Sequence, residues 1–230
     1  MIVGPNACGK STLLRSLARL HPSSGGSVLL DGHPIARYRP RDRAKLLAVL
    51  PQGAEAPEGI TVADLVARGR HPHRSLFQRW TAADQAATES AMTAAGVSQL
   101  GGRSLESLSG GQRQKVWIAM ALAQGADILL LDEPTTFLDL AHQIDLLELC
   151  ATLNRAGKTI VAVLHDLNQA ARYASRLIVM RAGEILAQGL PEDILTPGFI
   201  DEVFQVRSIV IPDPLTGKPL IIPKPPTYKD

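Results

Sequence analysis

The sequence is poor in cysteine, nearly balanced in charge and without long apolar runs. Two cysteines, Cys8 and Cys150, among 230 residues are too few for a disulfide framework, which indicates a reducing, cytoplasmic setting. The formal net charge of +2 argues against a dedicated nucleic-acid binder, because such proteins carry a strong basic field. No apolar run approaches the ~18 residues of a membrane span, and no signal-peptide pattern is recognisable.

The apolar runs that are present predict an α/β fold. Ile128–Leu131 and Thr159–Leu164 are continuous and apolar, which is typical of parallel strands covered on both faces. Helical segments lie between them, so we expect a parallel sheet flanked by helices. Leu46–Leu50 is predicted as a further short strand, and no internal repeats are found.

Other segments predict hairpins and a helical insertion. Residues 53–108 change character, with Thr61 as an N-cap and Thr81-x-x-Asp84 as a near capping box. The chain is therefore predicted to be one domain, 1–230, with a core of 1–52 and 109–230 and an inserted helical subdomain of 53–108. Hairpins are predicted around Asp31-Gly32, which is a type I′ turn signal, around Ala182-Gly183, and between Ser208–Ile211 and Pro219–Ile222.

A phosphate-binding loop stands almost at the first residue. The pattern G-x-x-x-x-G-K-[ST] is matched by Gly4-Pro5-Asn6-Ala7-Cys8-Gly9-Lys10-Ser11-Thr12. Its glycines let backbone N–H groups converge on phosphate oxygens, and the helix that follows offers its N-terminal N–H groups to the same anion. Lys10 would contact the β- and γ-phosphates, and Ser11 would ligate Mg²⁺. The alternative is a glycine turn before an ordinary helix.

Two adjacent carboxylates follow the first apolar run. Leu129–Leu131 would deliver Asp132 to the carboxyl edge of the sheet, where ligands bind in such folds. Asp132 could hold Mg²⁺ through its water shell, and Glu133 could orient or deprotonate the attacking water. A solvated strand end is the alternative, and the phosphate-binding loop favours the hydrolytic interpretation.

A second anion-binding helix start is predicted at Ser109. Ser109 is a good N-cap, and Gly110 and Gly111 leave backbone N–H groups accessible before Gln112 and a helix that runs through Gln124. A plain capped helix is the alternative. One chain does not need two such sites for one nucleotide, whereas two chains packed head to tail would use both.

These motifs make the sequence similar to the nucleotide-binding subunits of ABC transporters, and the resemblance covers essentially the whole chain. Leu108–Gln112 matches the signature motif LSGGQ, Gln52 stands at the Q-loop position, Asp139 in the D-loop and His165 at the switch-histidine position. The resemblance implies an ATPase core with an antiparallel β subdomain, here incomplete, and an inserted helical subdomain. It implies the cofactors ATP and Mg²⁺, with Ser11, Gln52 and Asp132 toward Mg²⁺.

The resemblance also implies roles and partners. Glu133 would be the catalytic base, His165 would contact the γ-phosphate, and Gln52 would sense Mg²⁺ and the membrane partner. Ser109 and Gly111 of a second copy of the chain would bind that phosphate. The implied partners are the homodimer mate, a polytopic permease and an extracytoplasmic siderophore-binding protein, with the chain at the cytoplasmic face of the membrane and no nucleic acid.

Several stretches are similar to the iron–siderophore importer branch, namely Ala67–His73, Arg79–Asp84, Thr135–Asp139, Val163–Ala170 and Val210–Pro214. Haem and cobalamin importers share much of this pattern, so they stay open as alternatives. From other classes, a soluble ABC protein of translation or DNA repair would carry two cassettes or a coiled-coil arm. A P-loop kinase or GTPase would lack the LSGGQ turn and Glu133 directly after Asp132.

Two further expectations concern a loop and the start of the chain. His71 and His73 could form a metal site, but a solvated loop or a permease contact is favoured for Arg68–Arg74. Only Met1-Ile2-Val3 precede Gly4, whereas a phosphate-binding loop normally follows a strand of about 5–6 residues. We therefore expect a truncated N-terminus, from a late start codon or a cut fragment, with weak ATP binding and poor folding as written.

Overall fold

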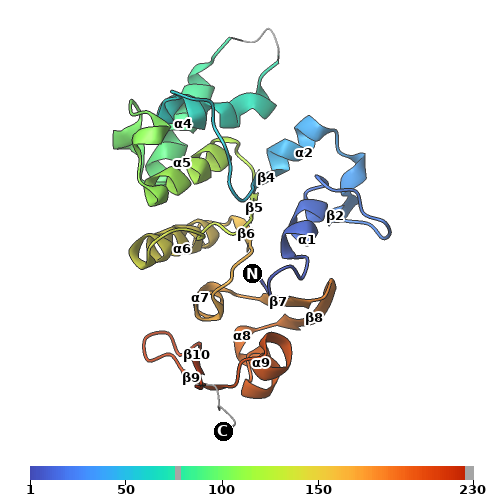
Figure 1. Cartoon of the computed structure of the whole chain (residues 1–230). Helices are drawn as coiled ribbons and strands as arrows, with labels where there is room; N and C mark the ends of the chain where they lie inside the picture. Colours follow the sequence, from blue (N-terminus) through green and yellow to red (C-terminus); the bar gives the residue numbers. More distant parts are fainter. Residues whose placement is uncertain (76–78, 226–230) are drawn as a thin grey trace. The chain divides into compact units, whose positions relative to one another are not determined.

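The computed structural model describes residues 1–75 and 79–225 and divides the chain into two compact units (Figure 1). One unit comprises Met1–Leu14 and Ala162–Asp230, and the other comprises Arg15–Val161. The predicted helical subdomain 53–108 includes residues 76–78, and the predicted domain 1–230 also includes 226–230, all of which lie outside the described residues.

The unit Arg15–Val161 contains a three-stranded sheet in the order β4-β5-β6. Its strands are β4 Leu47–Leu50, β5 Ile128–Leu131 and β6 Thr159–Ala162, of which the last residue, Ala162, belongs to the other unit. Strands β4 and β5 are parallel, with Leu47 opposite Ile128 and Leu50 opposite Leu131. The side chains of Leu129, Leu130 and Leu131 are buried, as expected for a strand covered on both faces. The predicted parallel α/β fold is confirmed.

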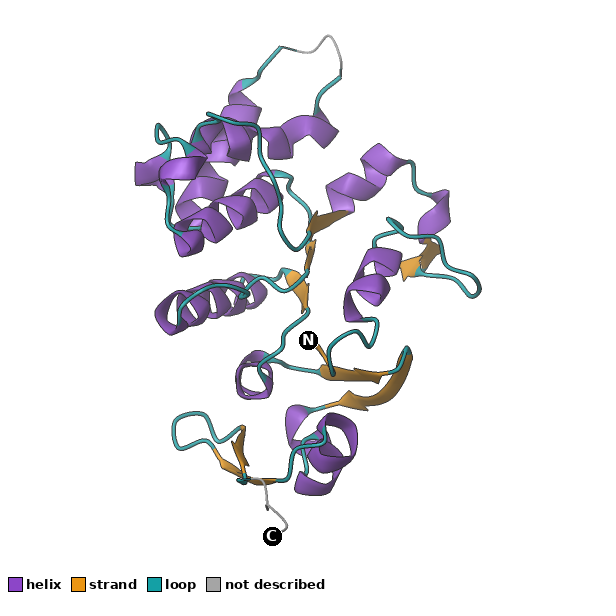
Figure 2. Ribbon diagram, in the orientation of Figure 1, coloured by secondary structure: helices purple, strands orange, loops and turns teal. Residues whose placement is uncertain are grey.

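Helices make up most of this unit (Figure 2). They are α1 Lys10–Leu17, which begins in the other unit, η1 Ile35–Arg37, α2 Pro40–Leu46, α3 Val62–Ala67, η2 Arg68–His73, α4 Ala82–Ala94, η3 Ser98–Leu100, η4 Leu105–Ser107, α5 Gly110–Ala123 and α6 Leu140–Arg155.

Local polar contacts explain where several of these helices begin. The Thr61 hydroxyl accepts a hydrogen bond from Asp64 N at the start of α3. Thr81 and Asp84 form a complete capping box at the start of α4. Both predicted N-caps are confirmed. Helix α2 is not predicted from the sequence, and it takes Leu46, which we expected in the following strand; Pro40 stands in its first turn, where a missing N–H costs nothing.

The predicted Asp31-Gly32 hairpin is present as β2 Leu29–Leu30 paired antiparallel with β3 His33–Pro34. Asp31 has φ +49° and Gly32 φ +76°, the positive pair that a type I′ turn requires.

The unit Met1–Leu14 with Ala162–Asp230 contains a second three-stranded sheet in the order β1-β7-β8. Strand β1 Ile2–Val3 is parallel to β7 Leu177–Arg181, which is antiparallel to β8 Glu184–Gly189. Ile2 also bridges Val163 in parallel. The hairpin of β9 Ser208–Pro212 and β10 Pro219–Pro223 is confirmed, and the helices are α7 Leu167–Tyr173, α8 Pro191–Ile194 and α9 Pro197–Phe204. Among the described helices, none has the length and apolar character needed to cross a bilayer.

Candidate nucleotide-binding site

The phosphate-binding loop, Gly4–Thr12, curls around the ammonium group of Lys10. Lys10 is 5% exposed, and its Nζ donates to the carbonyls of Gly4 at 2.9 Å and Pro5 at 2.8 Å. Gly9 has φ +100°, a conformation that L side chains rarely adopt. A Cβ on Gly4 would lie 2.2 Å from the carbonyl oxygen of Met180, so only glycine allows this approach. The loop thus presents a buried cation at the start of α1.

The turn between β7 and β8 anchors the loop. Gly183 N donates to Cys8 O at 3.0 Å, and the Cys8 side chain is buried within the loop. Cys8 and Cys150 are both free thiols. Burial raises the pKa of Cys150 to about 12, so this thiol stays protonated and unreactive at neutral pH.

The end of β5 carries the two predicted carboxylates. Asp132 is 2% exposed, and its N–H donates to Leu50 O at 2.9 Å, which continues the β4–β5 pairing. The Nη2 atom of Arg15 lies 3.6 Å from Asp132 Oδ2. Parallel pairing therefore brings Asp132 to the carboxyl edge that the sequence predicts, next to a cation that the sequence did not point out.

Glu133 adopts an unusual backbone conformation that aims its side chain. Its φ of +52° lies in the left-handed region, which non-glycine residues occupy at a cost and often at functional sites. Gln52 Nε2 donates to Glu133 Oε2 at 2.6 Å, and Thr136 Oγ1 donates to the same oxygen at 3.2 Å. The structure thus brings together Gln52 and Glu133, two predicted site residues 81 positions apart.

The residues predicted to face Mg²⁺ offer suitable donors. Asp132 and Gln52 belong to the unit Arg15–Val161 and Ser11 belongs to the other unit. A carboxylate, an amide carbonyl and a hydroxyl are all oxygen donors, which Mg²⁺ prefers. The amide nitrogen of Gln52 donates to Glu133, so the amide oxygen of Gln52 is the atom that could face the ion. The Asp132 carboxylate and the Gln52 amide oxygen, both in the unit Arg15–Val161, suit an ion that takes one or two protein ligands and completes its shell with water and phosphate.

The predicted signature turn is a reciprocal capping box. Ser109 Oγ accepts from Gln112 N at 3.2 Å, and Gln112 Oε1 accepts from Ser109 N at 3.1 Å. Gly110 and Gly111 are the first two residues of α5. Asp139 caps α6 by accepting from His142 N at 2.9 Å. The turn therefore shows the helix start that the sequence predicts.

The remaining predicted residue, His165, is exposed and precedes α7 in the unit that also holds the phosphate-binding loop. The neighbouring Asp166 caps α7 by accepting from Gln169 N at 2.9 Å. Sequence reasoning did not single out His142 or Gln143. Their place in the first turn after Asp139 is the signal that could have pointed to them.

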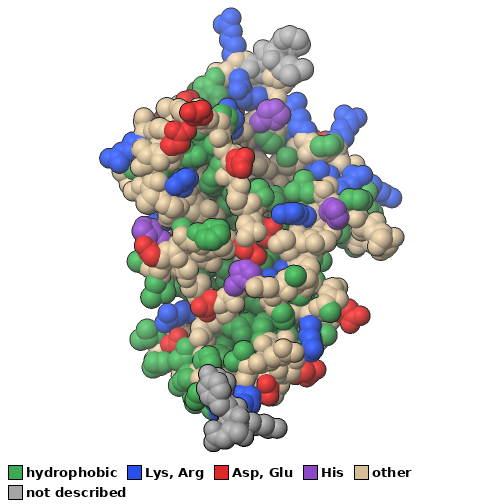
Figure 3. All heavy atoms as spheres, in the orientation of Figure 1, with side chains coloured by type: hydrophobic (Ala, Val, Ile, Leu, Met, Phe, Trp, Pro, Cys, Tyr) green, Lys and Arg blue, Asp and Glu red, His purple; other side chains and the backbone are tan. Residues whose placement is uncertain are grey.

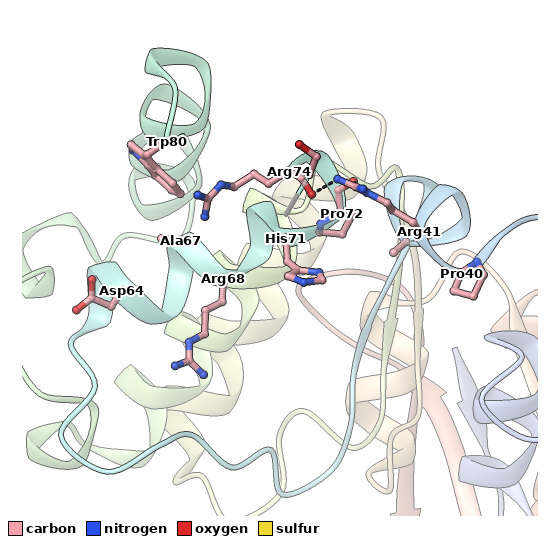
Figure 4. A pocket seen from close by; sticks show the side chains of 11 residues that line it. Pro40, Arg41, Asp64, Ala67, Arg68, His71, Pro72, Arg74 and Trp80 are labelled. Carbon is pink, nitrogen blue, oxygen red and sulfur yellow. Dashed lines mark hydrogen bonds between the residues drawn. The ribbon is translucent and has the colours of Figure 1, made fainter. Parts of the chain in front are cut away.

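A pocket of about 1080 Å³ lies on the unit Arg15–Val161 (Figure 4). It is lined by residues of α2, α3, η2 and the following loop, namely Pro40, Arg41, Ala44, Asp64, Ala67, Arg68, His71, Pro72, Arg74, Ser75 and Trp80. The Arg41 guanidinium donates to the carbonyls of Pro72 and Arg74, and the Arg74 guanidinium lies 5.4 Å from the centre of the Trp80 ring.

His71 and His73 do not share a site. His71 lines the pocket, whereas the Nε2 atom of His73 lies 2.7 Å from Gln124 O. Within residues 1–75 and 79–225, no three His, Cys, Asp or Glu side chains gather into a metal-binding group.

Known proteins resemble this chain over nearly all of its length. The family described as "ABC transporter" matches residues 1–136. The ferric enterobactin transport ATP-binding protein of Escherichia coli (strain K12) is 54% identical over 96% of this chain and 82% of its own. The probable siderophore transport system ATP-binding protein of Bacillus subtilis (strain 168) is 51% identical over 97% and 82%. A solved metal-chelate type ABC transporter in an inward-facing conformation matches with a TM-score of 0.84 and 28% identity, over 98% of this chain and 86% of that one.

Proposed function

Because this chain belongs to the ABC transporter family of ATP-binding proteins, we propose that it hydrolyses MgATP to power the import of ferric siderophores through a membrane permease. The observation that carries the substrate class is the identity of 54% and 51%, over almost the whole chain, to two ATP-binding proteins named for ferric enterobactin and siderophore transport. We place the chain at the cytoplasmic face of the membrane, attached through that permease.

The chemistry follows from positioning and charge, since phosphoryl transfer leaves little covalent work to the protein. The loop Gly4–Thr12 would cradle the phosphates, and Lys10 would exchange its contacts with the Gly4 and Pro5 carbonyls for phosphate oxygens. Bound Mg²⁺, held by Ser11, Gln52 and Asp132, would neutralise charge on the phosphates. Glu133 would take a proton from the attacking water, and His165 would contact the γ-phosphate.

The Gln52–Glu133 hydrogen bond supports these assignments. An amide that donates to one oxygen of Glu133 fixes the orientation of the carboxylate. Gln52 would thereby link the base to the Mg²⁺ environment through one side chain.

We also propose that the working unit is a homodimer in which Ser109–Gln112 faces the nucleotide of the second copy. Three large apolar side chains lie exposed on α6 and on the loop that precedes it: Phe137 is 98% exposed, Leu140 68% and Ile144 37%. The loop holding Phe137 contacts the turn, because a Cβ on Gly110 would lie 3.4 Å from Leu138 Cδ2. An exposed apolar patch of this kind is typical of an interface.

The permease would dock at the pocket of α2, α3 and η2. The lining holds Arg41, Arg68, Arg74 and His71 against one acid, Asp64 (Figure 4). Basic side chains also gather at the upper right of Figure 3. Helix α2 itself carries Arg41, Arg43 and Lys45 against one acid, Asp42. A cytoplasmic permease segment with acidic residues and an apolar side chain that packs near Trp80 would complement this surface.

Charge reversal tests the docking surface. Arg68→Glu places a carboxylate on the exposed rim of the pocket and should weaken co-purification with the permease, while Arg103→Glu, on another exposed arginine of the same unit, serves as the matched control. An equal loss of co-purification in both variants, or no loss in either, would mean that the permease docks elsewhere.

Transport in the native host tests the function as a whole. Cells lacking this chain should lose uptake of radiolabelled ferric siderophore and regain it from the wild-type gene but not from Glu133→Gln. Labelled haem and cobalamin are tested beside it. Loss of haem or cobalamin uptake with intact siderophore uptake would assign the chain to one of those importers instead.

A further inference from the structure

His142, in the first turn of α6, bonds to the predicted D-loop residue. Its Nδ1 atom lies 2.7 Å from Asp139 Oδ1, and its backbone N donates to the same oxygen at 2.9 Å. These two contacts, the backbone one first, hold the pKa of Asp139 below its usual value, so the carboxylate is ionised at neutral pH. The imidazole is thereby fixed in orientation relative to the D-loop.

The same ring occupies the space next to Gly111 of the signature turn. A Cβ on Gly111 would lie 2.1 Å from His142 Cδ2, 2.5 Å from Cγ and 2.9 Å from Cβ. Gly111 is not among the glycines with positive φ, so its backbone conformation alone does not call for glycine. The missing side chain is instead what lets the imidazole approach α5.

Neighbouring contacts hold the same two segments together. Gln143 Nε2 donates to Leu138 O at 2.9 Å and to Thr135 O at 3.4 Å, so α6 supports the loop from Thr135 to Asp139 along its length. Leu138 in turn faces Gly110. His142 is the one described side chain among these that touches both Asp139 and Gly111.

We propose that His142 is a positioning residue for ATP hydrolysis, which holds Asp139 and the turn Ser109–Gln112 in one fixed arrangement within each chain. The inference rests on the proposed function, in which the turn Ser109–Gln112 faces the nucleotide of the second copy. His142 itself contacts no reacting atom in this scheme. It acts through Asp139 and Gly111, so that the D-loop and the signature turn reach the nucleotide as one body.

Three substitutions separate this role from simple packing. His142→Ala removes the ring, His142→Asn keeps a donor near the position of Nδ1, and His142→Gln places its amide near the position of Nε2. With the permease and saturating MgATP, we expect kcat to fall roughly tenfold for Ala and Gln and to recover in Asn, because only Asn can restore the bond to Asp139. KM for ATP should stay close to the wild-type value, since the phosphate-binding loop is unchanged. The exposed His33→Ala is the matched control.

A double variant provides an independent measurement. If His142 acts through Asp139, then His142→Ala combined with Asp139→Ala should be no slower than the slower single variant, because the two lesions remove one interaction. Wild-type kcat in His142→Ala, equal rates in the Asn and Ala variants, or fully additive losses would each overturn the proposal. A wild-type complex that hydrolyses no MgATP would instead refute the proposed function, so the two failures are distinguishable.

Discussion

At the residue scale, the predicted chemistry depends on a backbone that only the structure reveals. Glu133 follows a regular buried strand in the sequence, yet its φ is +52°, outside the range that most side chains favour. That turn directs its carboxylate to Gln52 at 2.6 Å. Strain kept at a residue with a fixed hydrogen-bond partner is typical of a functional position.

Replacement of Glu133 separates binding from hydrolysis. Glu133→Gln keeps the shape of the side chain but loses the base, so ATP hydrolysis in the permease complex should fall about 10²–10⁴-fold while ATP binding persists. Lys10→Ala should instead weaken ATP binding, because it removes the buried cation of the phosphate-binding loop. Phosphate release and equilibrium ATP binding are measured for both. Wild-type turnover in Glu133→Gln would rule out its role as the base.

At the element scale, short-range signals in the sequence predicted where three of the helices begin and where the chain turns at Asp31-Gly32. Thr61, Thr81 and Ser109 cap helices because the hydroxyl of each accepts a hydrogen bond from a backbone N–H in the first turn of the helix. Such a contact is local, so it can be predicted without knowledge of the fold. Asp31-Gly32 predicted its turn for the same reason. Contacts between distant segments could not be predicted in this way, among them His142 against Gly111.

One such long-range contact joins α7 to the hairpin β9–β10. Asn168 Oδ1 accepts from Ile221 N at 2.7 Å, and Asn168 Nδ2 donates to Ile221 O at 3.1 Å. One side-chain amide therefore pairs with both the backbone N–H and the backbone C=O of Ile221. Arg172 adds an ion pair to Asp213 at 3.4 Å. The helix that follows His165 is thus fixed to the hairpin by side chains to which the sequence analysis gave no role.

Loss of the Asn168 amide should loosen that hairpin. Asn168→Ala leaves two part-buried backbone groups of Ile221 without this partner and should destabilise the unit by about 1–3 kcal/mol. Hydrogen exchange of residues 208–223 should accelerate. The control is Asn154→Ala, which removes a single exposed bond to Lys158 O. Unchanged exchange in Asn168→Ala would mean that the strand pairing alone holds the hairpin.

At the scale of the whole molecule, the predicted catalytic set is divided between the two compact units. The loop Gly4–Thr12 and His165 belong to one unit, whereas Gln52, Asp132, Glu133 and the turn at Ser109 belong to the other. The sequence order of these motifs identified the family without any contact, because the order itself is specific. The order of the motifs does not say whether one chain or two chains supply the parts of a single site. The answer decides whether the working unit is a monomer or a dimer.

Mixed dimers answer that question. In a head-to-tail pair, one site combines Lys10 of one chain with Ser109 of the other. Mixing Lys10→Ala chains with Ser109→Arg chains therefore places both lesions in one site and leaves the second site intact. Each homodimer, in contrast, has a lesion in both of its sites. We expect the mixture to recover part of the ATPase activity that neither variant shows alone, measured in the permease complex with two distinguishable affinity tags.

Glu133→Gln protein supplies the companion measurement. Because this variant binds ATP without hydrolysing it, ATP should cause dimers to accumulate, which light scattering detects. No recovery in the tagged mixed dimer, together with no ATP-promoted dimer of Glu133→Gln, would refute the shared sites and leave Ser109 as a plain helix cap.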